Sequence, residues 1–207
     1  MPLHPFSEDQ IIARLQFENP WWSKGSLDEF YQSLKPRLYF NLFYPLVKNK
    51  SVHRATVLMG PRRVGKTVML YHTIQQLIAD GIKPQKILYA SIETPIYNNI
   101  HLEELFTMAK KASGNMEADG WFIFFDEIQY LKDWEVHLKT LVDGNRETKF
   151  IASGSAATAL KLKSTESGAG RFTDFLLPPL TFYEFIHLKN LAALIKPDTI
   201  SWKGNIS

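Results

Sequence analysis

The chain has 207 residues, of which 45% are hydrophobic and 13% aromatic, enough to bury one substantial core. Its 24 basic and 21 acidic residues nearly cancel, so the net charge of +3 gives no support to nucleic acid as a partner, although it leaves one open. The chain has no cysteine, which excludes disulfides, thiolate zinc sites and cysteine nucleophiles.

Neither a membrane span nor a leader is predicted. No apolar run reaches the ~18 residues of a membrane helix, and the start MPLHPFSEDQ lacks the apolar core of a signal peptide. We therefore expect a cytoplasmic protein without a membrane partner. Residues 191–207 carry no strong periodicity, and we interpret them as the truncated start of a lid or C-terminal region.

Residues 1–50 are predicted to form an aromatic-rich helical segment that packs on the core. Trp21 and Trp22 in this segment could form a partner surface, but tryptophan is mostly buried, which favours packing. From 51 to 190, apolar runs alternate with helical stretches, the pattern of an α/β fold with a helix-covered parallel sheet. Strands buried on both faces are predicted at 55–59, 87–92, 121–126, 149–153 and 172–177.

Two helices of the core have clear sequence signals. The first covers 66–79 and ends at Gly81, and the second begins after Asp133 as N-cap and ends at Gly144. The residues predicted to face the sheet are Leu70, Ile74, Leu77 and Ile78 in the first helix and Trp134, Leu138 and Leu141 in the second.

The segment after the first predicted strand matches the P-loop pattern G-x-x-x-x-G-K-T. Glycines let successive backbone N–H groups point at anionic oxygens, and the start of the next helix adds its positive dipole end. We predict that Lys66 reaches the β and γ phosphates and that the Thr67 hydroxyl binds Mg²⁺. A chance match in a glycine turn, with solvated loop arginines, is the alternative. The predicted nucleotide contacts are Gly60, Pro61, Arg62, Arg63, Val64, Gly65, Lys66, Thr67 and Val68.

A second acidic motif follows in WFIFFDEIQYL, where the apolar run ends in Asp126 and Glu127. Buried acids need a cation, so we predict that Asp126 holds Mg²⁺ and that Glu127 activates the attacking water. A pair of acids that merely starts a helix is the alternative. A small-molecule kinase has no need of a water-activating glutamate, so hydrolysis is favoured over phosphoryl transfer to a substrate.

Later residues could complete such a site. Ser153 and Ser155 are predicted to contact the γ-phosphate or the lytic water, with an N-cap of the next helix as the alternative for Ser155. Arg171 could reach a neighbouring subunit's γ-phosphate as a finger, with a plain surface arginine as the alternative. The histidines are scattered singly without a ligand spacing such as H-x-x-x-H, so no histidine metal site is predicted.

Five blocks resemble, in order and spacing, the prokaryotic AAA-type ATPases of the P-loop superfamily, which usually carry a separate C-terminal domain of unknown function. They are GPRRVGKT, FFDEIQYLKDWE, IASGSAA, SGAGR and LPPLTFYEF, and the resemblance runs over 19–188. It implies a three-layer P-loop NTPase sandwich, a five-stranded parallel sheet of order 5-1-4-3-2, and ATP as the nucleotide. The roles it implies are Walker A for Lys66 and Thr67, Walker B for Asp126 and Glu127, sensor for Ser153 to Ser155, and finger for Arg171.

The sequence departs from this family in two ways. The sensor is often Asn or Thr there, and members continue into a helical lid that closes over the adenine, whereas this chain ends at Ser207. Two hypotheses result. The first is a Mg²⁺-dependent ATPase coupled to a protein partner or a homo-oligomer. The second is a nucleotide-gated interaction or regulatory module that binds ATP or ADP with negligible turnover and holds a surface for another protein or for DNA.

Overall fold

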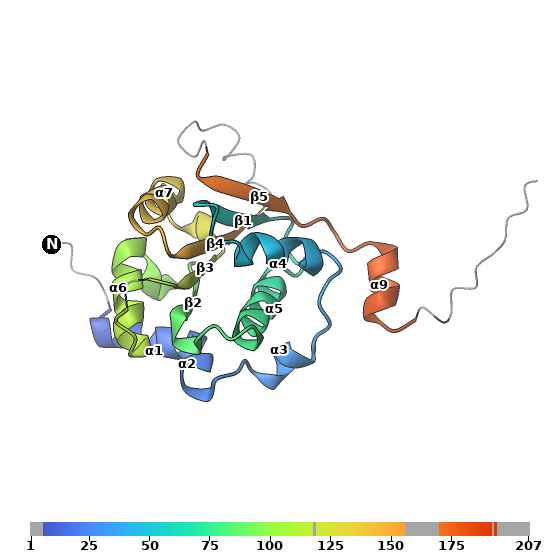
Figure 1. Cartoon of the computed structure of the whole chain (residues 1–207), viewed down its shortest axis with the longest axis horizontal. Coiled ribbons are helices and arrows are strands. Elements are labelled where there is room, and N and C mark those ends of the chain that lie inside the picture. Colours follow the sequence, from blue (N-terminus) through green and yellow to red (C-terminus); the bar gives the residue numbers. More distant parts are fainter. Residues whose placement is uncertain (1–5, 118, 156–169, 192, 194–207) are drawn as a thin grey trace, which may run out of the picture.

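Apolar runs build the parallel sheet at the centre of this computed structural model, which describes residues 6–117, 119–155, 170–191 and 193 (Figure 1). The sheet has five strands in the order β2-β3-β4-β1-β5, and every neighbouring pair is parallel. This confirms the predicted order, read from the opposite edge. The strands are β1 Ala55–Met59, β2 Ile87–Ser91, β3 Phe122–Asp126, β4 Lys149–Gly154 and β5 Phe172–Leu176.

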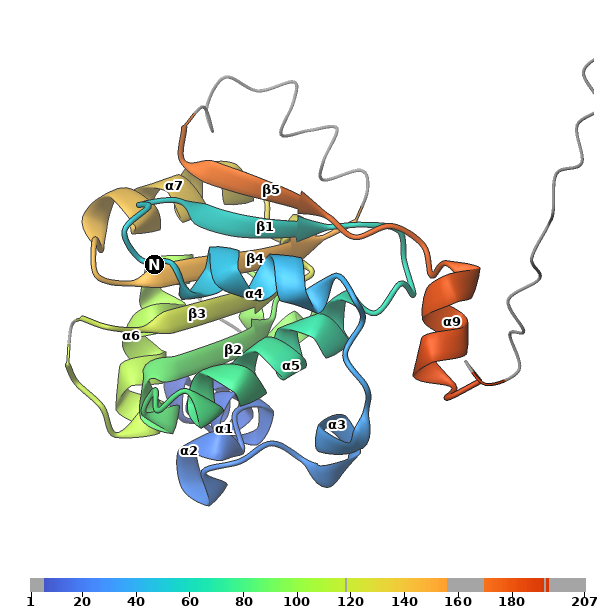
Figure 2. The ribbon, with the colours of Figure 1, turned by 45° about the vertical axis from the view of Figure 1, so that its right-hand side comes forward.

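Helices cover both faces of the sheet, which gives the predicted three layers (Figure 2). α4 and α5 lie on one face, α6 and α7 lie on the other, and α1 and α2 lie beside β2. α9 stands beyond the ends toward which the strands point. The α-helices are α1 Glu8–Glu18, α2 Trp21–Lys24, α3 Glu29–Ser33, α4 Phe40–Lys48, α5 Lys66–Ala79, α6 Leu102–Ser113, α7 Trp134–Gly144 and α9 Phe182–Leu188. The 3-10 turns are η1 Pro84–Lys86, η2 Pro95–Tyr97 and η3 Ile128–Tyr130. In the part of the chain that is described, no helix is both long and apolar enough to span a membrane.

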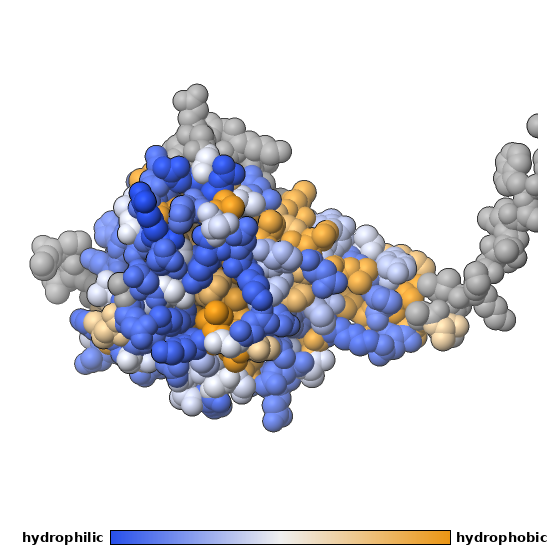
Figure 3. All heavy atoms as spheres, viewed as in Figure 1, coloured by the Kyte–Doolittle hydropathy of each residue, from blue (hydrophilic) through white to orange (hydrophobic). Residues whose placement is uncertain are grey.

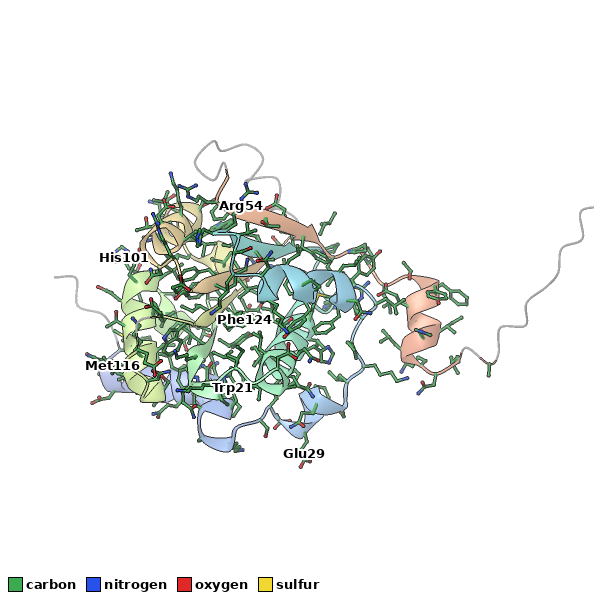
Figure 4. All side chains as sticks on the ribbon, viewed as in Figure 1. Trp21, Glu29, Arg54, His101, Met116 and Phe124 are labelled. Carbon is green, nitrogen blue, oxygen red and sulfur yellow. The ribbon has the colours of Figure 1, made fainter. Side chains whose placement is uncertain are left out.

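The core lies on both faces of the sheet and is rich in aromatic residues such as Trp21 and Phe124, which Figure 4 labels. β1, β3 and β4 are buried along their whole length, as predicted. The same prediction is wrong for β5. This strand pairs with β1 at the sheet edge, and its Leu176 is 62% exposed. A strand at the sheet edge, with one neighbouring strand, does not need a continuous apolar run.

The two predicted helices agree with the structure except in detail. α5 ends before Gly81, whose φ of 90° suits glycine. Ile78 is only half-buried. The buried stripe predicted for α7 is confirmed, and so is Asp133 as the N-cap residue, although it does not cap the helix with its side chain. Asp133 occupies the N-cap position in the left-handed region with φ 52°, where its side chain makes no capping hydrogen bond.

Side chains of the N-terminal segment cover the outer edge of β2. The Asn19 side chain donates to the Tyr89 carbonyl at 2.8 Å and accepts its N–H at 2.6 Å. The indoles of Trp21 and Trp22 both donate to the Ile87 carbonyl, at 3.0 and 2.7 Å. Both tryptophans are buried, as predicted. An open edge strand invites pairing with other chains, so this segment closes a surface that would otherwise associate.

The Asn19→Ala substitution tests this edge cover. It leaves the two backbone groups of Tyr89 buried without a partner, and each such group costs about 1–3 kcal/mol. We expect the free energy of unfolding to fall by roughly 3 kcal/mol in urea denaturation. Asn41→Ala on the exposed face of α4 is the control, with an expected change below about 0.5 kcal/mol. Equal effects of the two substitutions would contradict the account.

Candidate functional site

The predicted phosphate loop joins the end of β1 to the start of α5, at the end of the sheet that faces α9 (Figure 2). Arg63 has φ 65° and Gly65 has φ 91°, both in the left-handed region. Left-handed residues within a turn point successive N–H groups into one concavity that binds anions. Gly65 is the N-cap of α5 and provides no side-chain cap, so the first N–H groups of the helix face the same concavity.

Packing explains why residue 60 is a glycine, in addition to the P-loop motif. A Cβ on this residue would lie 2.5 Å from the Leu177 carbonyl oxygen, closer than any real contact. The N–H of Leu177 in turn donates to the Met59 carbonyl at 2.7 Å. The chain leaving β5 therefore lies directly against the loop, and only glycine fits between them.

The other loop residues differ in exposure. Pro61, Arg62 and Arg63 are exposed, whereas Val64, Thr67 and Val68 are half-buried. Lys66 is 4% exposed, and its ammonium donates to the carbonyls of Gly60 at 3.3 Å and Pro61 at 3.1 Å. A buried ammonium within a loop that also directs backbone N–H groups into one concavity is an arrangement suited to phosphate oxygens.

Asp126, at the carboxyl end of β3 and 2% exposed, is the centre of the site. Its Oδ2 accepts the hydroxyls of Thr67 and Tyr89, both at 2.8 Å. Its Oδ1 accepts the Ser153 hydroxyl and, at 3.2 Å, the Glu127 N–H. Residues from α5, β2 and β4 therefore meet on one buried carboxylate. Hydrogen bonds of this kind offset the cost of burying a charge.

Tyr89 is a donor that the sequence interpretation missed. Burial, together with the charge of Asp126, raises the pKa of the Tyr89 phenol, so the group stays protonated at neutral pH. Its ring packs against Tyr71, with centroids 4.9 Å apart. Because Tyr89 belongs to β2, the edge strand covered by the N-terminal segment is tied to the acid at the tip of β3.

Glu127 has φ 53°, a left-handed conformation that is unusual outside glycine and is often found at functional sites. Its N–H donates to the Ser153 hydroxyl at 3.1 Å. One carboxylate oxygen lies 3.7 Å from the Lys66 ammonium, and the other accepts a hydrogen bond from the Gln129 amide. The two predicted catalytic residues, Lys66 and Glu127, are thus neighbours.

Gln129 and the predicted sensor serines form the next layer. The Gln129 amide oxygen accepts the Ser155 N–H at 3.3 Å, so this glutamine connects Glu127 to the end of β4. Ser153 contacts both acids, which gives it a positioning role, and its contact with a phosphate or water stays a prediction. The residues after Ser155 that were expected to form a helix, 156–169, lie outside the described residues.

The donor atoms suit a hard cation. Thr67 and Asp126 present a hydroxyl and a carboxylate oxygen 2.8 Å apart, and oxygen ligands of this kind are those Mg²⁺ prefers. The buried ammonium and the loop N–H groups suit the phosphates beside it. The residues present therefore fit a magnesium nucleotide.

An ion pair that the sequence did not suggest braces the loop. The Arg37 guanidinium, 9% exposed, donates to both carboxylate oxygens of Glu184, at 3.0 and 2.6 Å. It also donates at 2.9 Å to the carbonyls of Val64 in the phosphate loop and Pro178 ahead of α9. Arg37 therefore joins the segment before α4, the phosphate loop and α9.

Glu184 also completes the start of α9. Its side chain and that of Thr181 form a capping box. Burial alone would raise the pKa of Glu184, but the hydrogen bonds from Arg37 and Thr181 outweigh it and hold that pKa below its ordinary value. A cavity of about 320 Å³ lies beside this pair. It is lined by Lys35, Pro36, Leu38, Glu184, His187, Leu188 and Asn190.

Arg171 lies just before β5, at the opposite end of the strands from the phosphate loop. Its carbonyl accepts the Ala55 N–H at 2.9 Å at the start of β1, close to Arg54 in Figure 4, and its side chain pairs with Asp143. The length of β1 separates it from the phosphate loop, about 16 Å at the usual strand rise. Arg171 therefore cannot serve the loop of its own chain. That Arg171 reaches the nucleotide of a second copy as a finger stays a prediction.

Residues 52–186 match the AAA domain family. This chain belongs to that family. Membership indicates a nucleotide-binding, ATPase-like domain, in agreement with the loop and the two acids described above. The implied separate C-terminal domain stays a prediction.

Relatives of this AAA domain occur in bacteria and archaea. The chain is 28% identical over 152 residues to an uncharacterized protein of Haemophilus influenzae, covering 73% of this chain and 38% of that protein. It is 33% identical over 140 residues to the uncharacterized protein MJ1637 of Methanocaldococcus jannaschii, covering 65% and 28%. The match thus spans 38% of the length of the first relative and 28% of the length of the second.

A solved structure shares the fold. The Aeropyrum pernix ORC1 protein, determined in complex with DNA, superposes with a TM-score of 0.53 at 12% sequence identity. The superposition covers 77% of this chain and 50% of that one. At this identity the likeness concerns the fold of the AAA domain alone.

The Arg37–Glu184 pair gives a test of the brace. Arg37→Met leaves a buried carboxylate without its guanidinium, and breaking such a pair costs about 3–5 kcal/mol. Arg37→Met combined with Glu184→Leu removes both charges, and we expect it to recover at least half of that loss in urea denaturation.

The half-exposed pair of Lys111 and Glu8 supplies the control. Lys111→Met should lower the free energy of unfolding by less than about 1 kcal/mol. Glu184→Leu alone completes the comparison. A double variant that loses the sum of the effects of Arg37→Met and Glu184→Leu would show that the two side chains act independently.

Proposed function

We propose that this AAA domain binds ATP with Mg²⁺ and hydrolyses it to ADP and phosphate in order to drive or gate a partner. The supporting observation is the group of residues around Asp126. Its carboxylate contacts the Thr67 hydroxyl, and the adjacent Glu127 lies 3.7 Å from the Lys66 ammonium. Phosphate binding, a cation site and a candidate base therefore occur within one buried cluster.

The proposed nucleotide lies across Arg37, with its phosphates on one side of this residue and its base on the other. We assign the phosphates to Gly60–Thr67, where Lys66 and the first turn of α5 would hold them. We assign the base to the 320 Å³ cavity between the segment before α4 and α9. Arg37 lies between the two sites and contacts both. α9 would then form part of the binding site.

Glu127 is the proposed general base. Its carboxylate is held on one side by Gln129 and faces Lys66 on the other. A phosphate in the loop would draw the Lys66 ammonium toward itself and leave Glu127 to orient and deprotonate a water. Thr67 and Asp126 would hold Mg²⁺, which when bound neutralises the charge that develops on the phosphates.

A neighbouring subunit is part of the proposal. Arg171 is 45% exposed at the end of the strands opposite the phosphate loop, so only a second copy could present it to the nucleotide as a finger. The segment around α9 also exposes apolar side chains, visible on that part of the surface in Figure 3. They are Leu176, Leu180, Phe182, Tyr183 and Phe185. This surface favours a protein partner, and the near-balanced charge gives no support to DNA.

A nucleotide-gated module that binds without turnover is the second candidate, favoured by the same exposed surface on α9. Two substitutions separate the candidates. Lys66→Ala should weaken binding of a fluorescent ATP analogue by at least tenfold, because it removes the ammonium that holds the phosphates. Glu127→Gln should bind the analogue as wild type does. It should release phosphate at least about 10²-fold more slowly, because it lacks the general base.

Binding and phosphate release are measured in the same samples. Arg146→Ala, an exposed arginine between α7 and β4 and outside the phosphate loop, is the control and should bind the analogue as wild type does. Phosphate release in wild type no faster than in Glu127→Gln, with binding intact, would overturn the hydrolase and leave the gated module. Unchanged binding in Lys66→Ala would overturn both.

A further inference from the structure

The fold brings together two histidines and a carboxylate that the sequence shows as isolated residues. His101 is the N-cap of α6, Glu103 lies in the first turn of α6, and His137 lies in the first turn of α7. Figure 4 labels His101 at the end of α6 that lies near α7. The imidazole rings of the two histidines are 5.0 Å apart between centroids.

The ligand atoms of this His101/Glu103/His137 cluster converge on one point. One nitrogen of each imidazole and one carboxylate oxygen of Glu103 all lie within 4.8 Å of one another. His137 Nδ1 lies 4.0 Å from Glu103 Oε2. Ligands at the usual Zn²⁺ bond lengths of about 2.0–2.2 Å are some 3.3 Å apart in a tetrahedron, so small side-chain rotations would complete the site.

The surroundings allow an ion to enter. His101 is exposed, and Glu103 and His137 are half-buried. The two histidines line a groove of about 680 Å³. The groove also contains Asp133, which adds negative charge, and Lys132, which adds positive charge. Because the two histidines open onto the groove, a fourth coordination position is accessible to water or a further ligand.

We propose that His101, Glu103 and His137 form a binding site for a divalent transition metal ion of the Zn²⁺ type. Imidazole nitrogen and carboxylate oxygen together suit Zn²⁺ better than Mg²⁺, which prefers oxygen ligands alone. The ion would connect α6 to α7, two helices that pack side by side on one face of the sheet. The site is separate from the residues of the proposed nucleotide site and does not depend on that proposal.

Calorimetric titration with Zn²⁺ tests the site. The whole chain is first freed of metal with a chelator and is then titrated in excess Mg²⁺. Wild type should bind one ion per chain. His101→Ala and His137→Ala should each weaken binding by at least about 100-fold, because loss of an outer-sphere partner alone costs 10–100-fold. Glu103→Gln should weaken it by at least about tenfold.

His53→Ala is the matched control, because His53 is an exposed histidine outside the cluster, and it should bind Zn²⁺ as wild type does. Zn²⁺ should also raise the melting temperature of wild type but not of His137→Ala, since the ion connects two helices. A simple contact between an imidazolium and Glu103 would give no stoichiometric Zn²⁺ binding and would overturn the site. Binding that survives in both histidine variants would place the ion elsewhere and overturn it equally.

Discussion

The buried carboxylate of Asp126 is the constraint on which the rest of the site depends. A carboxylate that is 2% exposed is stable only when hydrogen-bond donors surround it, and this one receives hydroxyls from Thr67, Tyr89 and Ser153. These donors belong to α5, β2 and β4, so the acid aligns the start of the phosphate-loop helix with two neighbouring strands. A cation at Thr67 and Asp126 would act on an arrangement that the fold already holds.

Two peripheral segments keep this arrangement in place. The segment from Asn19 to Trp22 covers the outer edge of β2 and so supports the strand that carries Tyr89. On the other side, Arg37 joins the phosphate loop to α9 through Val64 and Glu184. Both segments lie outside the central β-α units, and both rest on buried polar contacts. Such contacts are costly when incomplete, which makes these segments specific partners of the core.

The sequence predicted most of what depends on local pattern. Continuous apolar runs located the strands, and the resemblance to AAA-type ATPases implied their order. The glycine and acid motifs identified Lys66, Thr67, Asp126 and Glu127, which the structure brings together. Contacts between distant residues were out of reach. No local signal links Arg37 to Glu184, or His101 to His137. In the sequence, Tyr89 looks like one more apolar strand residue, and nothing indicates that its hydroxyl contacts Asp126. The exposure of Leu176 was missed because the edge position of β5 is set by pairing and not by its own residues.

The central proposal is that a nucleotide binds at the phosphate loop together with Mg²⁺, which Thr67 and Asp126 would hold. The Mg²⁺ dependence of ATP affinity tests it most directly. The measurement is a titration of wild type and Asp126→Asn with a fluorescent ATP analogue across a range of Mg²⁺ concentrations, with circular dichroism to confirm that both are folded. The account predicts that Mg²⁺ tightens binding to wild type and that this gain is lost in Asp126→Asn, while binding without Mg²⁺ persists. Equal Mg²⁺ dependence in the two proteins, or no effect of Mg²⁺ on wild type, would contradict it.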